Sequence, residues 1–178
     1  IDVSPDGKYI VFDLLGDLYL LSIRGGKAKQ ITYGMALDTQ PRFSPDGSKI
    51  LFTSDRDGAE NIWVLNLGTA LISKSFNKDK ITYSAITNGG DASYASPEWS
   101  PDGKYVVVSR TPRFTWIDVN HNLWMYHIND VEGTPLLYDD EKIFALGPAF
   151  GPEVDQLYFV NRHPENEDPF GHQVEKYN

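Results

Sequence analysis

Short runs of apolar, β-branched and aromatic residues recur along the chain, and each is bounded by glycine, proline, serine or aspartate. The clearest set comprises Tyr9–Phe12, Ile50–Phe52, Tyr105–Val108 and Leu157–Val160. Runs of this length and composition are typical of β-strands. Because no long segment shows the 3.6-residue periodicity of an amphipathic helix, the pattern predicts an all-β chain.

Further apolar segments flank each run, so that every repeat has four predicted strands. The lead-in strands are Ile1–Val3, Arg42–Phe43, Glu98–Trp99 and Ala149–Phe150, the third strands are Asp17–Leu20, Asn61–Val64 and Asn122–Met125, and the weaker fourth strands end near Ile31–Thr32, Ile86–Thr87 and Leu136–Leu137. Lys80–Thr82 is an alternative for the second repeat, but Ile86–Thr87 gives the spacing of the first repeat. The aromatic residues at one position of the third strand, Tyr19, Trp63 and Trp124, are expected to pack between repeats.

A Ser-Pro-Asp-Gly turn joins the first two strands of each repeat. It occupies Ser4–Gly7, Ser44–Gly47 and Ser100–Gly103, at spacings of 40 and 56 residues, and a degenerate copy begins at Gly151–Pro152. Proline presets the φ angle of a type I turn, and glycine takes the left-handed position that closes the hairpin. These residues therefore have a structural reason to recur.

Four short antiparallel strands repeated every ~40–50 residues are typical of the blades of a β-propeller. We expect blades at 1–34, 35–90 and 91–140, and an incomplete blade at 141–178. The fold class is thus an all-β propeller fragment of four-stranded antiparallel blades, about three complete blades and a partial fourth. The chain lacks an initiator Met and a signal peptide, so we expect it to come from a larger protein. Unpaired sheet edges predict that the isolated fragment self-associates.

The repeats resemble the TolB-type, WD-like propeller repeats of bacteria, and most of all a propeller that precedes an amidohydrolase domain in large bacterial proteins. Val3–Lys8, Ile10–Asp17, Gln40–Gly47, Phe52–Gly58 and Pro97–Gly103 carry the resemblance. It implies a periplasmic or secreted parent in which a non-catalytic propeller docks on, or gates, a metal-dependent hydrolase domain. A stand-alone TolB-like interaction module of the cell envelope and a substrate-filtering propeller of a serine peptidase are the alternatives.

Composition excludes several classes of function. The formal net charge of −9 disfavours nucleic acid as a partner, since binding needs a basic face. No apolar run is long enough for membrane insertion, and a chain without cysteine has neither disulfides nor thiolate zinc sites. The four histidines form no metal-binding motif, and no Gly-x-Ser-x-Gly elbow is present. Asp55–Gly58 is better explained as a hairpin than as a calcium loop. No catalytic residue, metal or cofactor is therefore expected.

Loop placement gives the one functional hypothesis from the residues themselves. In a blade of alternating strands, the loops between strands two and three emerge at the same end as the links between blades. The candidate binding residues at that end are Tyr33, Asp38, Tyr94, Arg110, Arg113, Trp116, Arg162 and His163. Aromatic residues and arginine are enriched where proteins bind partners. We expect this end to contact a partner domain or a ligand, the alternative being that the loops only cap the blades.

Overall fold

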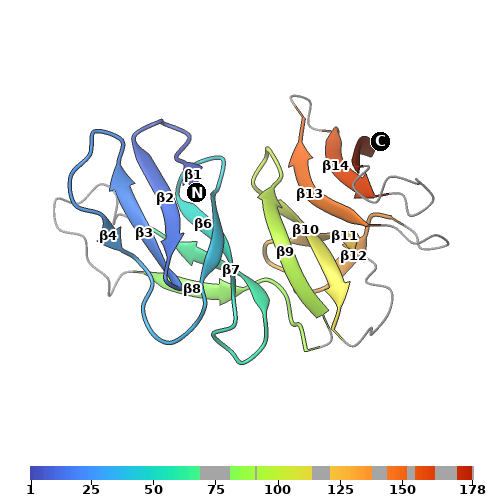
Figure 1. The fold of residues 1–178 in the computed structure, drawn as a ribbon, viewed down its shortest axis with the longest axis horizontal. Coiled ribbons are helices and arrows are strands. Elements are labelled where there is room, and N and C mark those ends of the chain that lie inside the picture. The colour runs from blue at the N-terminus through green and yellow to red at the C-terminus, as the bar shows by residue number, and fades with distance from the viewer. Residues whose placement is uncertain are drawn as a thin grey trace.

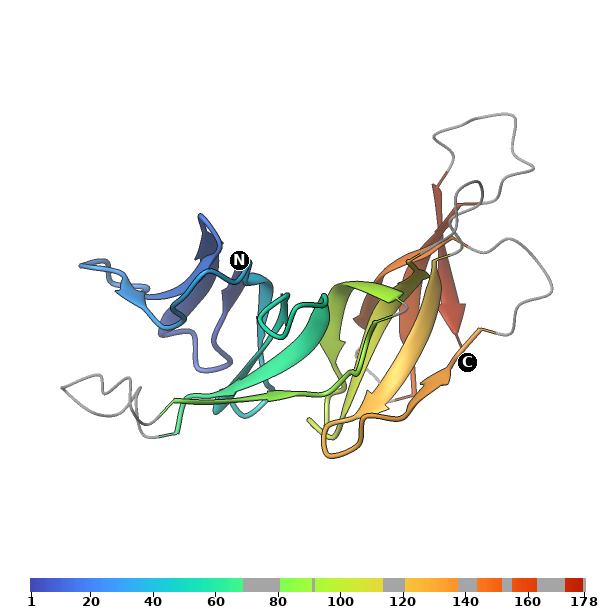
Figure 2. The ribbon, with the colours of Figure 1, turned by 90° about the horizontal axis from the view of Figure 1, so that it is seen from below.

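The computed structural model describes residues 1–68, 81–90, 92–113, 121–137, 144–151, 155–162 and 172–177. These residues form four antiparallel sheets that follow one another from the N-terminal to the C-terminal side (Figure 1; Figure 2). Each sheet holds its strands in chain order, which is the arrangement of propeller blades. The described residues contain no helix, and so none that could cross a bilayer. The predicted all-β propeller fold is confirmed.

The bounds of the strands are as follows. The first sheet holds β1 (Asp2–Val3), β2 (Tyr9–Leu14), β3 (Asp17–Ser22) and β4 (Lys29–Gln30). The second holds β5 (Thr39–Phe43), β6 (Lys49–Ser54), β7 (Asn61–Asn66) and β8 (Thr82–Ala85). The third holds β9 (Ala92–Trp99), β10 (Tyr105–Pro112), β11 (Asn122–His127) and β12 (Gly133–Pro135), and the fourth holds β13 (Ala145–Phe150), β14 (Leu157–Arg162) and β15 (His172–Tyr177).

The fourth strand of the second sheet ends where the preferred interpretation places it. In Ile31–Thr32 and in Ile86–Thr87, the isoleucine N–H donates to a carbonyl of the third strand, that of Leu18 (2.8 Å) or Ile62 (2.9 Å). The N–H of that same third-strand residue donates to the Oγ1 of the threonine, at 2.8 and 2.9 Å. Ile86–Thr87 is therefore the structural equivalent of Ile31–Thr32.

The Ser-Pro-Asp-Gly turns have the geometry that their residues predict. In the turn at Ser44, the N–H of Gly47 donates to the Ser44 carbonyl (2.8 Å), and Gly47 has a φ of 71°. The Ser44 hydroxyl donates to Oδ1 of Asp46 at 2.6 Å. The turns at Ser4 and Ser100 repeat both hydrogen bonds. These contacts fix the hairpins at Ser4–Gly7, Ser44–Gly47 and Ser100–Gly103. The three hairpins lie at the same end of their sheets, which we call the turn end.

The carboxyl group of Asp46, in the turn at Ser44, predicts how the stability of the protein depends on pH. The Ser44 hydroxyl holds the pKa of Asp46 at about 2, below its usual 3.8. Because the folded state depresses this pKa, the stabilisation from the ionised carboxylate is present above about pH 4 and is lost as the pH falls toward about 2. The difference in Tm between the native protein and Asp46→Asn should therefore be largest above about pH 4 and fade below it. A difference that stays constant down to about pH 2 would contradict this assignment.

The first strands of the second, third and fourth sheets each contain a β-bulge. Gln40, Ser96 and Gly147 have φ angles of 54°, 52° and 57°, each precedes a proline, and the pairing register shifts beside each of them. A positive φ is costly for a residue other than glycine. The surrounding structure must therefore hold Gln40 and Ser96 in place.

Side-chain to backbone hydrogen bonds join the first strands of neighbouring sheets, which lie against one another. Oε1 of Gln40 accepts from the N–H of Ser96 at 2.6 Å, so the bulge of the second sheet bonds to that of the third. Oδ2 of Asp2 accepts from the N–H of Phe43 at 2.8 Å. These bonds connect sheets that share no strand ladder.

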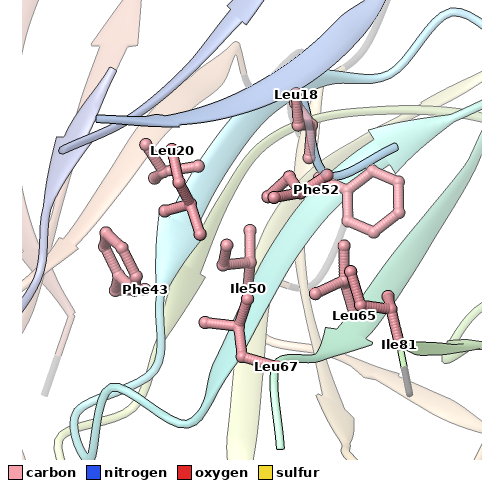
Figure 3. Packing of buried hydrophobic residues seen from close by; sticks show 10 residues of the cluster. Leu18, Leu20, Phe43, Ile50, Phe52, Leu65, Leu67 and Ile81 are labelled. Carbon is pink, nitrogen blue, oxygen red and sulfur yellow. The ribbon is translucent and has the colours of Figure 1, made fainter. Parts of the chain in front are cut away.

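The apolar core lies between the sheets in three clusters. Figure 3 shows the first cluster, where Leu18 and Leu20 of the first sheet face Phe43, Ile50, Phe52 and Leu65 of the second. The second cluster joins the second and third sheets, and the third joins the third and fourth. As expected, Trp63 and Trp124 pack against these clusters. Tyr19 differs, because it stacks on Phe12 of its own sheet.

Candidate functional site

One end of the molecule gathers the turns between the second and third strands together with the links between sheets. We call it the loop end, and in the first two sheets it comprises Leu15–Gly16, Ile31–Asp38, Asp55–Glu60 and Ile86–Gly90. The Asp38 N–H donates to the carbonyl of Gly16 at 2.9 Å, so link and turn lie side by side. In the third sheet His121 forms an isolated bridge with Phe144. The topology expected from strand alternation is present.

Exposed apolar side chains mark the loop end of the first two sheets. Leu15 is 97% exposed and Met35 is fully exposed. The set at this place consists of Leu14, Leu15, Tyr33, Met35 and Leu37, which we call the apolar patch. Sequence analysis identified only Tyr33 among them. Exposed apolar patches mark interaction sites more often than isolated exposed residues do.

A buried ion pair supports the link beneath this patch. Nη2 of Arg56 lies 2.7 and 2.8 Å from the two carboxylate oxygens of Asp38. The Arg56 side chain is 16% exposed and that of Asp38 only 1%. Nε of Arg56 also donates to the Ser54 hydroxyl at 3.2 Å. Asp38, a predicted site residue, is thus buried and holds the link in place.

The Arg56 guanidinium also lies among aromatic rings. Its carbon is 4.3 Å from the centroid of Tyr83, 5.1 Å from Phe52 and 5.3 Å from Trp63. The Tyr83 hydroxyl donates to the carbonyl of Ile31 at 3.0 Å, and burial raises the pKa of Tyr83. Cation–π contacts of a desolvated arginine are worth about 2 kcal/mol. Arg56 therefore joins the second sheet to the end of the first.

A shallow hollow of about 390 Å³ opens beside the patch. Its lining is Tyr33, Gly34, Met35, Ala36, Asp55 and Arg56. The Asp55 Oδ1 accepts from the N–H of Leu37 at 2.7 Å, which holds the rim. A larger hollow of about 670 Å³ lies at the turn end, but its Ser4, Asp6 and Asp46 groups are already bonded within their own turns. The loop end is thus the better candidate for a binding surface.

The Asp55–Gly58 segment is the hairpin that sequence analysis preferred over a calcium loop. The N–H of Gly58 donates to the Asp55 carbonyl at 2.8 Å, and Asp57 accepts from the Asn61 amide at 3.0 Å. Within the described parts of the chain, no group of three His, Cys, Asp or Glu side chains could hold a metal ion.

The sequence also matches a protein-family model. The model of the TolB β-propeller domain matches residues 2–123. The chain belongs to the TolB β-propeller family. The match runs from β1 into β11, and so it includes the whole apolar patch and the Arg56–Asp38 pair.

Curated relatives of this TolB-type propeller share short stretches with it. The chain is 31% identical over 93 residues to the Tol-Pal system protein TolB of Desulfotalea psychrophila, covering 52% of this chain and 19% of that protein. It is 43% identical over 54 residues to the same-named protein of Bordetella pertussis, covering 30% of this chain and 12% of that protein. The chain therefore spans a fifth or less of the length of these relatives.

Solved structures share the fold over most of the chain. The putative TolB from Agrobacterium tumefaciens superposes with a TM-score of 0.71 at 22% identity, over 98% of this chain and 56% of that one. An oligogalacturonate lyase in complex with manganese gives a TM-score of 0.70 at 15% identity, over 98% of this chain and 48% of that one. At such identities the likeness shows the fold alone.

Tyr94 of this TolB-type propeller lies elsewhere than expected. It belongs to β9 and not to the link before it, because β10 extends to Pro112 and pairs with Ala92–Ala95. The Tyr94 ring is only 3% exposed and packs edge to face on Tyr126 at 6.2 Å. A Cβ on Gly89 would come within 2.7 Å of that ring, so the link passes directly over it. The expectation that Tyr94 is a loop residue is wrong, because its ring is part of the core.

Two further candidates, Arg110 and Arg162, belong to the third and fourth sheets of the TolB-type propeller. Arg110 lies over the ring of Trp124 at 4.4 Å, which resembles the position of Arg56 over Trp63. Arg113 is exposed directly after β10, and Arg162 ends β14, where it pairs with the first residue of β15. Trp116 and His163 lie outside the described residues.

His121 lies at the same end of the third sheet, directly before β11. Its Nδ1 is 2.6 Å from Oγ1 of Thr111, and burial lowers the pKa of His121. The imidazole is therefore neutral near pH 7 and serves as a structural hydrogen-bonding group at the start of β11.

Proposed function

We propose that this TolB-type propeller is a non-catalytic module that binds protein through its loop end. The observation that supports the proposal is the apolar patch, whose exposed side chains lie on the turn after β2 and on the link that the buried Arg56–Asp38 pair holds in place. Loops on a rigid scaffold commonly carry binding function. Fixing the link before a partner arrives reduces the entropy lost on association.

The partner that we propose is a hydrolase domain of the amidohydrolase type in the same, longer protein, acting in the periplasm or outside the cell. The repeat sequences support this choice, through their resemblance to propellers that precede such domains. The propeller would dock on that domain or gate access to it. Arg110 and Arg113 of the third sheet lie at the same end and would extend the contact.

A stand-alone interaction module is the second candidate. It is supported by the relatives named Tol-Pal system protein TolB, because that name describes a protein working within a system of partners. In this case the loop end would meet a separate protein. Self-association of the isolated chain also stays a prediction, and light scattering over a concentration series tests it.

Site-specific photo-cross-linking in the full-length protein tests the proposal. A photoreactive benzoylphenylalanine is introduced at Met35 in one variant and at Lys8 in another. Both positions are exposed, but Met35 lies at the loop end and Lys8 at the turn end. We expect cross-links from position 35 and not from position 8, with the attached peptide identified by mass spectrometry.

The attached peptide separates the two candidates. A peptide from a hydrolase domain of the same chain supports the docking module, whereas a peptide from another envelope protein supports the stand-alone module. Equal labelling at both positions, or none at position 35, would remove the loop end as the binding face.

A further inference from the structure

The apolar patch contains an unusual share of the exposed apolar side chains. Eleven large hydrophobic side chains are exposed among the described residues, and five of them belong to the patch. These five come from only two short segments, Leu14–Leu15 and Tyr33–Leu37. Single exposed hydrophobic residues are ordinary on protein surfaces, but a concentrated group is not.

The fold brings the two segments together and holds them. The Asp38 N–H donates to Gly16, directly after Leu15, and the Leu37 side chain lies beside Gly16. The Leu37 N–H donates to Asp55. The patch is therefore one surface of fixed shape, built on the first and second sheets.

Acidic side chains share the loop end with this patch, and the basic side chains at that end do not balance their charge. The loop end of the first two sheets, together with the residues Asp13–Asp17 around its first turn, contains a single basic residue, Arg56. That residue is bonded to Asp38. The remaining acidic residues of these segments are Asp13, Asp17, Asp55, Asp57 and Glu60. None of these five forms an ion pair with another described residue.

We infer that this surface binds a basic amphipathic segment of a partner protein, with apolar side chains on the patch and flanking lysine or arginine on the acidic rim. The inference rests on the proposed function, since it names the chemistry of what the loop end binds. Apolar burial supplies affinity, and complementary charge supplies orientation and a faster encounter. A second copy of this chain fits poorly, because it would bring one acidic rim against another.

Peptide binding to the full-length protein tests this inference. The probe is a fluorescent peptide of about 16 residues that has leucine on one helical face and lysine along its edges. Its counterpart keeps the leucine face and carries glutamate in place of lysine. We expect the lysine peptide to bind at least about tenfold more tightly than the glutamate peptide. Raising the salt concentration should weaken the binding of the lysine peptide.

Surface variants locate the binding. The double variant Leu15→Ser, Met35→Ser should lower the affinity for the lysine peptide by at least about tenfold. Asp13→Lys should lower this affinity by several fold. The matched controls are Val131→Ser and Asp130→Lys, exposed positions at the turn end of the third sheet, which should leave the affinity unchanged. These controls matter because a chain of net charge −9 attracts basic peptides in general.

Three outcomes would overturn the inference. The lysine peptide could fail to bind, the glutamate peptide could bind as tightly, or the control variants could weaken binding as much as the patch variants. A cross-link from position 35 together with any of these outcomes would leave the proposed function standing and reject only the basic partner. Peptide binding at the patch without a cross-link in the full-length protein would instead reject the proposed docking and retain the surface chemistry.

Discussion

Replacing Arg56 by methionine is expected to destabilise the protein by about 3–5 kcal/mol. The Asp38 carboxylate, 1% exposed, would lose both contacts to the guanidinium and remain as an unpaired buried charge. The variant would also lose the cation–π contacts with Tyr83, Phe52 and Trp63. Equilibrium unfolding in urea, followed by tryptophan fluorescence, measures the change in the free energy of unfolding.

Two further variants make this result specific. Arg24→Met removes an exposed arginine from a turn and should change the free energy of unfolding by less than about 0.5 kcal/mol. Adding Asp38→Asn to Arg56→Met should restore part of the lost stability, since the double variant leaves no buried charge. If Arg56→Met proves as mild as Arg24→Met, the buried pair does not hold the link.

Trp99→Ala is expected to cost about 3–5 kcal/mol. Trp99 is 4% exposed and packs with Val64 and Val106 in the cluster between the second and third sheets. Its Nε1 also donates to the carbonyl of Arg42 at 3.3 Å, across the boundary between these sheets. Trp99→Phe keeps most of the apolar contact and loses this hydrogen bond, so it should cost less than Trp99→Ala. Calorimetric unfolding measures both.

Tyr105→Ala is the matched control for Trp99→Ala. Tyr105 is a partly exposed aromatic residue of the same sheet, and its ring contacts His127 near the turn end. Its removal should cost about 1 kcal/mol or less. Equal losses for the two variants would mean that packing between sheets contributes no more than a surface contact.

The repeating strands could be predicted because their local signals agree. The Ser-Pro-Asp-Gly turns fix where one strand ends and the next begins, and the short apolar runs after them have strand composition. The loop end followed from strand alternation alone. The β-bulges at Gln40 and Ser96 could not be predicted, because a positive φ before proline goes against local preference and depends on bonds between sheets.

The candidate site was predicted less completely, for a similar reason. Leu15 and Met35 are apolar residues of the kind usually found in a core, and they are exposed only because they lie in a turn and in a link. Tyr94 is of a residue type that is common at binding surfaces, yet it is buried because β9 extends to include it. The hairpin at Asp55–Gly58 was predicted, but the role of Arg56 depends on Asp38 and Tyr83, which are far from it in the sequence.

The hydrogen bonds between first strands have a consequence for how such a chain tolerates change. Gln40 and Asp2 join neighbouring sheets along the first strands, while the fourth strands β4 and β12 have only two and three residues. The connection from the third to the fourth strand runs from Ser22 to Lys29 in the first sheet and from Asn66 to Thr82 in the second. The connection at the margin formed by the fourth strands thus differs in length between the two sheets, whereas the bonds between sheets lie along the first strands. A reporter peptide or an additional recognition loop is best grafted at this margin, between Ser22 and Lys29.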